Sequence, residues 1–457
     1  MIFEYGTNRL RQGGLSARPV SMLDPAARAD LALLAEIDMI ENGDAAAREN
    51  WQGRQLVNLL RHASERSPFW RKRILTRSLT PQTLQTLPVQ TRRDLIEQAE
   101  QEGSLMPRGG RVFTRSTSGS TGIPIKFHVT EQNGRYNSLR SLAQILMEGR
   151  SLHLNRVFVQ SLDATRTLDG TTVSVERAAS WFGPLGRVFE NGHNKTISYV
   201  ADRADAAAKE LLKDPVGYLV CTGRQFDNLL DVQGVELFKK AQVRHWIHIG
   251  DSQDASRRAT LLEAGISTLS NYSSEEVGPI GFECAQTPAH YHVAHSNVIV
   301  ETDQEETAEI DGQRLGRLLI THLHSYATPL IRYDIGDMGV LLPSCPCGHQ
   351  GPTLTAVHGR QKLFLRHPAG HLLKFNFVTK IFREIVNCSE ISIRQTGPQT
   401  VLFLLKRQSE LTEAEEQQAR QLLSRWISDA FEVVIRVVSE IDWSRNPKRL
   451  LFINELP

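Results

Sequence analysis

The stretch from Thr117 to Pro124 places two glycines among small hydroxyl residues and ends in a proline. Glycine tolerates positive φ and lets the backbone approach a ligand closely. Successive backbone N–H groups and hydroxyls can then surround phosphate oxygens. Apolar Val112-Phe113 precedes the stretch and Ile125-Lys126-Phe127 follows it, which predicts a loop between two strands. A mobile Gly/Ser surface loop is the alternative.

The same stretch differs from the common strand-to-helix phosphate loop. No Lys-Ser or Lys-Thr pair follows its second glycine, as the pattern G-x-x-x-x-G-K-[ST] requires. The predicted loop is therefore a flap between strands.

Length and charge limit the classes of protein that fit. A chain of 457 residues exceeds the usual size of one core, so we expect two or more domains. A net charge of +2 offers no basic field for nucleic acid, and no apolar run approaches the roughly 20 residues of a membrane span. Met1 to Tyr5 lacks the pattern of a signal peptide, so we expect a cytoplasmic protein.

Strand-like and helix-like patterns alternate along the first three quarters of the chain. Strands separated by helices favour parallel sheets with helices on their faces. The predicted helices lie at 25–49, 55–64 and 252–264, and predicted strands at 156–160, 217–221 and 245–249.

The pattern changes near Gly359. Residues 373–438 are typical of helix, strand, strand, helix and strand, which predicts a small α+β domain. Thr412 and Glu415 have the spacing of a capping box at the start of its last helix.

Four further motifs follow the Thr117 stretch in a fixed order. They are Tyr272-Ser273-Ser274-Glu275-Glu276, Thr328-Pro329-Leu330-Ile331-Arg332-Tyr333-Asp334-Ile335-Gly336-Asp337, Gly359-Arg360-Gln361-Lys362 and Asn446-Pro447-Lys448-Arg449. Motifs in this order resemble those of the adenylate-forming superfamily, which includes acyl-CoA synthetases, nonribosomal adenylation domains and firefly luciferase. Nearer the N-terminus, Ser67-Pro68-Phe69-Trp70 and residues 87–95 resemble the phenylacetate-CoA ligase branch, as does Cys345-Pro346-Cys347-Gly348.

The resemblance implies a role for each motif. ATP would convert a carboxylic acid, aromatic in this branch, to an acyl-adenylate with release of pyrophosphate. Tyr272 would lie against adenine, Asp337 would accept both ribose hydroxyls, and Glu276 would hold Mg²⁺, which prefers oxygen ligands. The other implied residues are Thr117, Ser118, Gly119, Ser120, Thr121 and Gly122 for the ATP phosphates, Arg360 for AMP, Lys362 at a hinge and Lys448 as the catalytic lysine. Asp334 competes with Asp337, and Glu275 with Glu276.

Four residues could form a zinc site. Three thiolates and one imidazole make a closed tetrahedral site, which is structural because no position remains for substrate. Relatives in the branch carry a similar set, which corresponds here to Cys284, His292, Cys345 and Cys347. His292 is favoured over His290, and the alternative is a group of buried, unligated cysteines. Cys221 and Cys388 are expected to be core residues.

The sequence thus predicts an α/β protein with two domains. Residues 1–358 would form a large adenylate-forming domain with parallel-type sheets flanked by helices, and residues 359–457 a mobile α+β domain. The chain would activate a small carboxylic acid with ATP and Mg²⁺ and transfer the acyl group to CoA. The alternatives are transfer to an amine, a carrier protein or a protein cysteine, or a silent ATP- or acyl-binding scaffold. The motifs predict neither a nucleic-acid nor a membrane partner, and they leave the oligomeric state open.

Overall fold

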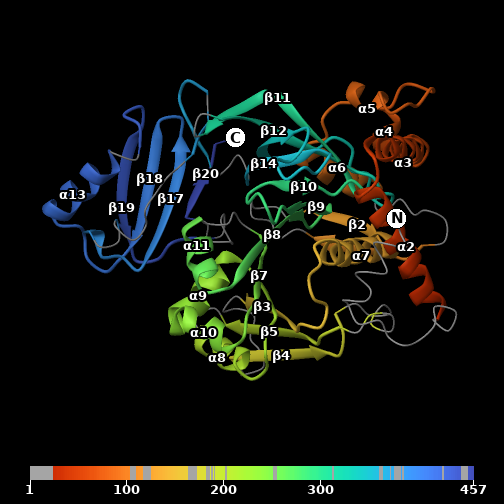
Figure 1. The fold of residues 1–457 in the computed structure, drawn as a ribbon. Coiled ribbons are helices and arrows are strands. Elements are labelled where there is room, and N and C mark those ends of the chain that lie inside the picture. Colours follow the sequence, from red (N-terminus) through yellow and green to blue (C-terminus); the bar gives the residue numbers. More distant parts are fainter. Residues whose placement is uncertain are drawn as a thin grey trace.

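The N-terminal part of the chain is helical (Figure 1). The computed structural model describes residues 24–102, 110–116, 125–162, 172–181, 186, 189, 191–200, 203–250, 255–310, 313–359, 364–370, 372–374, 382, 385–424, 427–443 and 451–456. Its first helices are α2 (Pro25–Glu41), α3 (Ala45–Arg66), α4 (Pro68–Arg71), α5 (Thr83–Thr86) and α6 (Arg92–Glu102).

The single helix predicted over 25–49 is wrong at its centre, because the chain breaks between α2 and α3. The Asp44 carboxylate accepts a hydrogen bond from the Ala47 N–H at 2.8 Å and starts a new helix there. Asp24 caps α2 in the same way through the Ala27 N–H. The helix predicted at 55–64 is the second half of α3.

Two strands flank the Gly/Ser/Thr stretch as predicted. β1 (Val112–Ser116) and β2 (Lys126–Thr130) pair antiparallel, from Val112 opposite Thr130 to Ser116 opposite Lys126. The stretch itself, 117–124, lies outside the described residues. The Thr130 hydroxyl then accepts from the Asn133 N–H and caps α7 (Glu131–Met147).

The main sheet has fourteen strands among the described residues, in the order β15-β16-β11-β12-β13-β14-β10-β9-β8-β7-β6-β3-β5-β4. Its parallel half carries a buried apolar core that includes Trp246 and Phe226. This half consists of β3 (Arg156–Leu162), β5 (Asn194–Val200), β6 (Tyr218–Cys221), β7 (His245–His248) and β8 (Ser267–Ser274), with β4 (Val173–Ala178) antiparallel at the edge. The helices α8 (Ala204–Leu211), α9 (Gly223–Gln233), α10 (Val235–Lys240) and α11 (Ala255–Glu263) connect these strands. The predicted parallel, helix-flanked sheet is confirmed for this half.

The other half of the sheet is mostly antiparallel, because its strands are joined by short connections that cannot make a parallel crossover. Its strands are β9 (Gly278–Glu283), β10 (Tyr291–Val293), β11 (Val298–Ile310), β12 (Gln313–His322), β13 (Tyr333–Leu342), β14 (Thr353–His358), β15 (Phe364–Arg366) and β16 (Leu372–Lys374). β8 belongs to both halves, since it pairs parallel with β7 and antiparallel with β9.

A smaller α+β unit follows and lies to one side of the main body (Figure 1). Its sheet has the order β19-β18-β17-β20. The elements are β17 (Glu390–Gly397), β18 (Thr400–Lys406), α13 (Glu413–Leu423), β19 (Glu432–Val438) and β20 (Phe452–Asn454). The capping box of Thr412 and Glu415 is present at the start of α13. The fold class is therefore confirmed, whereas the boundary at residue 359 stays a prediction.

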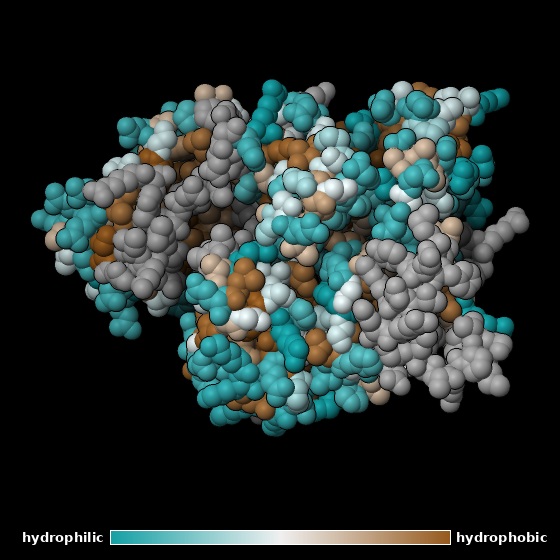
Figure 2. Space-filling view, viewed as in Figure 1, coloured by the Kyte–Doolittle hydropathy of each residue, from teal (hydrophilic) through white to brown (hydrophobic). Residues whose placement is uncertain are grey.

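Hydrophilic residues cover much of the face seen in Figure 2, above all over α8, α10 and α13. Large apolar side chains at the surface are scattered along the chain and include Leu75, Phe113 and Leu262. In the described part of the chain, none of the helices combines the length and the hydropathy needed to cross a bilayer.

Candidate active site and metal centre

The turn between β8 and β9 carries the second predicted motif. Tyr272 lies in β8 opposite Gly281 of β9, and Glu276 lies in the turn that follows. Gly278 has φ of +79°, and a Cβ there would come within 2.4 Å of the Asn137 side chain. The positive φ would strain any other residue here, and the turn packs against Asn137 of α7. The motif therefore stands at the carboxyl end of the last parallel strand, where α/β sheets bind their ligands.

Tyr272 and Asp337 are brought together from separate motifs. The Tyr272 hydroxyl donates a hydrogen bond to Asp337 Oδ2 at 2.8 Å. Burial raises the pKa of Tyr272 well above its usual value, and the Asp337 carboxylate raises it further. A carboxylate has about four acceptor sites, so the group can accept more than one hydroxyl donor.

Asp334, the competitor for the ribose role, is engaged in the local turn. Its carboxylate accepts from the Gly336 N–H at 2.8 Å and lies 3.5 Å from Arg317 Nη1. Gly336 has φ of +82°, as the turn requires. Asp334 therefore supports the turn, whereas Asp337 lies beside Tyr272, and the choice of Asp337 for the ribose stays a prediction.

Glu276 has a partner that the sequence did not single out. The Tyr333 hydroxyl donates to Glu276 Oε1 at 3.2 Å, and burial together with this carboxylate raises the pKa of Tyr333. Glu275 is exposed, whereas Glu276 is half-buried. The aromatic residue within Thr328–Asp337 was the only available signal for Tyr333.

Two adjoining cavities share part of their lining, and Glu276 lines the smaller one. The smaller is lined by Glu276 and His322, and the larger, of about 240 Å³, by aromatic side chains that include Trp51 and Tyr136. His324 lines both. Burial lowers the pKa of His324 to about 4 and that of His322 well below its usual value, so both rings are neutral.

The predicted zinc ligands form one group. One ligand atom from each of Cys284, His292, Cys345 and Cys347 lies within 4.8 Å of the other three. Cys284 follows β9, His292 belongs to β10, and the other two lie in the turn between β13 and β14. β10 pairs with both β9 and β14, which brings the three segments together.

Backbone hydrogen bonds shape the group. The Cys284 N–H donates to the His290 carbonyl at 2.7 Å, and the Gly348 N–H donates to the Cys345 carbonyl at 3.0 Å. Gly348 has φ of +94°, so glycine is required after the second cysteine of the turn. His290 itself is not a member of the group, and its Nδ1 lies near the Pro288 carbonyl.

The surroundings of the three cysteines and His292 shift several of their pKa values. Burial opposes ionisation of Cys284, but hydrogen bonds from the Thr287 and Gln286 backbones and from the other two thiols lower its pKa overall. Burial raises the pKa of Cys347 to about 11 and lowers that of His292 to about 4. Three cysteine sulfurs and a neutral imidazole are a donor set that Zn²⁺ binds, the thiols losing their protons as the metal enters. The four residues fit a closed structural zinc site.

Several predicted residues lie outside the described part of the chain. They are Thr117, Ser118, Gly119, Ser120, Thr121, Gly122, Arg360, Lys362 and Lys448. Cys221 is fully buried in the core of the parallel sheet, and Cys388 packs against the core of the small unit.

The fold is similar to that of known adenylate-forming enzymes, although no protein-family model and no curated protein matches the sequence. A structure of 2-hydroxyisobutyryl-CoA ligase in the postadenylation state, with 2-HIB-AMP, has a TM-score of 0.61 at 15% identity, covering 88% of this chain and 89% of that one. GH3.15 acyl acid amido synthetase has a TM-score of 0.52 at 14% identity, covering 90% and 88%. The chain therefore shares its fold with these two enzymes.

We expect Asp337→Ala to weaken binding of Mg·ATP by about 2 kcal/mol, or about thirtyfold, because charged hydrogen bonds to the ribose are lost. Calorimetric titration of the folded variant measures this change. Asp334→Asn is the matched control, and it should lower stability more than ATP affinity. A larger loss of ATP affinity in Asp334→Asn than in Asp337→Ala would show that Asp334, and not Asp337, binds the ribose.

We expect about one zinc per chain when the protein is purified without added metal. A Cys345→Ser/Cys347→Ser double variant should lose the metal and melt at a lower temperature, while Cys388→Ser, a cysteine outside the group, should keep it. Elemental analysis and thermal unfolding give the two readouts. Metal-free wild-type protein that stays metal-free after incubation with zinc would rule the site out.

Proposed function

We propose that this chain uses ATP and Mg²⁺ to activate a carboxylic acid as an acyl-adenylate and then transfers the acyl group to the thiol of CoA. The observation that carries the proposal is the hydrogen bond between Tyr272 and Asp337, because it brings together, at the end of β8, the two residues to which we assign adenine and ribose. The fold shared with a ligase crystallised with an acyl-adenylate supports it.

The residues divide the work of the first half-reaction. We assign Thr117 to Gly122 to the phosphates, Tyr272 to adenine, and Arg360 to AMP. Mg²⁺, held by Glu276, would neutralise charge on the phosphates. A carboxylate oxygen attacks the α-phosphorus, the bond to the β-phosphate breaks, and pyrophosphate leaves with the electron pair. The Lys448 ammonium would stabilise the charge that develops there.

In the second half-reaction a thiolate attacks the acyl carbon, the bond to the phosphate oxygen breaks, and AMP leaves. We propose that residues 359–457 rotate about Lys362 between the two steps, since a hinge residue absorbs such a backbone change. The zinc site would take no part in either step, because four protein ligands leave no open position.

The proposal leaves two identities to be determined, that of the carboxylic acid and that of the acyl acceptor. We propose an aromatic acid on the basis of the sequence motifs. The choice of CoA has a direct rival, because GH3.15 acyl acid amido synthetase has the same fold. Mass spectrometry of reactions that contain CoA or a panel of primary amines identifies the acceptor from the product.

We expect Lys448→Ala to slow adenylate formation by about a hundred- to a thousandfold, because one preorganised charge is lost. The same variant should still transfer the acyl group from a supplied acyl-adenylate. Lys362→Pro should show the reverse pattern, because proline restricts the φ change of the hinge. Rapid-quench measurement of each half-reaction gives the comparison.

Lys362→Ala is the control for the hinge, since it removes the side chain and leaves φ unrestricted. It should transfer at a rate close to that of the wild type. Equal slowing of both half-reactions in Lys448→Ala and in Lys362→Pro would contradict domain alternation.

A further inference from the structure

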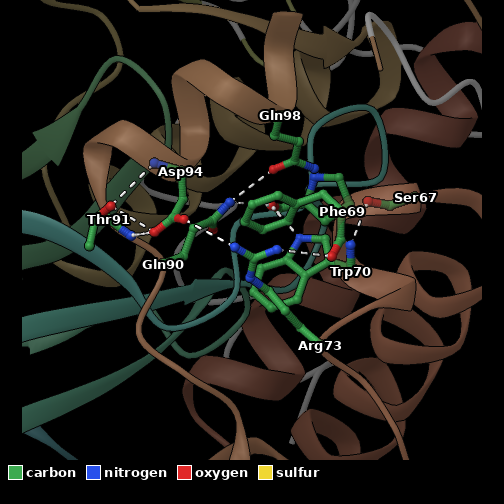
Figure 3. Close-up of polar contacts among 9 residues, drawn as sticks. Ser67, Phe69, Trp70, Arg73, Gln90, Thr91, Asp94 and Gln98 are labelled. Carbon is green, nitrogen blue, oxygen red and sulfur yellow. Dashed lines mark hydrogen bonds and ion pairs between the residues drawn. The ribbon is translucent and has the colours of Figure 1, made fainter. Parts of the chain in front are cut away.

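Residues 329–332, the segment that precedes β13, are bonded by Gln90 and Trp70 of the N-terminal region, whose side chains lie close together in Figure 3. The Pro329 carbonyl accepts two buried hydrogen bonds, from Trp70 Nε1 and from Gln90 Nε2, each at 3.3 Å. Trp70 is 0% exposed and Gln90 is 1% exposed. More than 230 residues separate Gln90 from this carbonyl along the chain.

Gln90 binds the segment with its backbone and with its side chain. Its N–H donates to the Arg332 carbonyl at 3.0 Å, and its carbonyl accepts from the Asp334 N–H at 2.9 Å. Its Oε1 accepts from the Ile331 N–H at 3.1 Å, while Nε2 also donates to Gln98 at 2.9 Å. The side-chain amide thus does for residues 329–331 what a neighbouring strand would do.

The segment needs these partners because it cannot pair as a regular strand. Pro329 has no N–H group. Arg332 has φ of +50°, in the left-handed region that a strand residue does not adopt. Ile331 is 0% exposed, so its backbone groups have no access to water and must be bonded within the protein.

Two residues of the candidate site lie directly beyond this segment. Tyr333 donates to Glu276 and is the next residue after Arg332, and Asp337 accepts from Tyr272 four residues later. Gln90 and Tyr333 also form a parallel bridge. A shift of the segment would therefore move the Tyr333 hydroxyl and, with it, the Glu276 carboxylate.

Gln90 is itself fixed by its neighbours (Figure 3). Thr91 and Asp94 bond each other reciprocally at the start of α6, with the Thr91 N–H donating to Asp94 at 2.8 Å. Asp94 pairs with Arg73 at 3.2 Å, and the Arg73 guanidinium lies 3.5 Å from the centre of the Phe69 ring. These contacts hold the chain on the C-terminal side of Gln90, and the bonds to Gln98 and from Ile331 orient its amide.

We propose that Gln90 is a positioning residue for the magnesium–nucleotide site. It acts through residues 329–332 on Tyr333, and through the Tyr333 hydroxyl on Glu276. The inference rests on the proposed function for the identity of the ligand. The hydrogen bonds from Gln90 to the segment do not depend on that function.

Gln90→Glu tests the proposal with a side chain of the same size. The carboxylate cannot donate to the Pro329 carbonyl, so the KM for Mg·ATP in ATP–pyrophosphate exchange should rise about tenfold or more near pH 8, with kcat affected less. Burial against carbonyl oxygens raises the pKa of such a carboxyl, and its protonated form donates again. The ratio of variant to wild-type KM should therefore shrink as the pH is lowered towards 6.

Two controls separate positioning from a general loss of stability. Gln90→Met should show a defect that is independent of pH, because methionine neither donates nor ionises. Gln98→Glu keeps a side-chain oxygen that can accept the hydrogen bond from Gln90 Nε2. This variant should have a KM for Mg·ATP close to that of the wild type. A lower melting temperature with unchanged KM in Gln90→Glu, or a defect independent of pH, would overturn the proposal.

Hydrogen–deuterium exchange separates this inference from the function on which it rests. Peptides that cover residues 328–337 should exchange faster in Gln90→Glu than in the wild type, whether or not either protein turns over ATP. Unchanged exchange there would contradict the link itself. An inactive wild type with faster exchange in the variant would overturn the proposed function and leave the link in place.

Discussion

Residues 328–332, the segment that precedes β13, lie largely buried in the main body without the regular hydrogen bonds of a strand, and residues from distant parts of the chain supply their partners. The Ser325 hydroxyl accepts from the Leu330 N–H, and the Thr321 hydroxyl accepts from the Arg332 N–H. Gln90 and Trp70 bond the segment from the N-terminal region. Because unpaired buried backbone groups cost free energy, the path of this segment is fixed, and the positions of Tyr333 and Asp337 follow from it.

Local features of the fold could be predicted from the sequence, whereas most contacts across the sheet could not, the group of Cys284, His292, Cys345 and Cys347 being an exception that the resemblance supplied. Apolar pairs around Thr117–Pro124 predicted β1 and β2, and the Thr412-x-x-Glu415 spacing predicted a helix start, because both depend on neighbouring residues. The antiparallel half of the sheet could not be predicted, because its strands pair with partners that lie far away along the chain, as β10 does with β14. Within the candidate site, the motifs indicated Tyr272, Glu276 and Asp337. They gave no reason to pair Tyr272 with Asp337, which lie 65 residues apart.

The charge balance of the site has a consequence for its ligand. Glu276 and Asp337 are acidic, and the described residues that line the adjoining cavities include no lysine or arginine. Burial keeps His322 and His324 neutral. A triphosphate bound here therefore needs positive charge from Mg²⁺ and from residues outside this lining, for which Arg360 and Lys448 are the candidates.

Formation of an acyl-adenylate is the step on which the proposed function depends. The most direct measurement is exchange of labelled pyrophosphate into ATP by the wild-type protein, with a panel of aromatic and aliphatic carboxylic acids. The account predicts exchange that requires both Mg²⁺ and one acid of the panel and that is lost in Lys448→Ala. Binding of Mg·ATP and of an acid without any acid-dependent exchange would contradict the account and leave a silent nucleotide-binding scaffold.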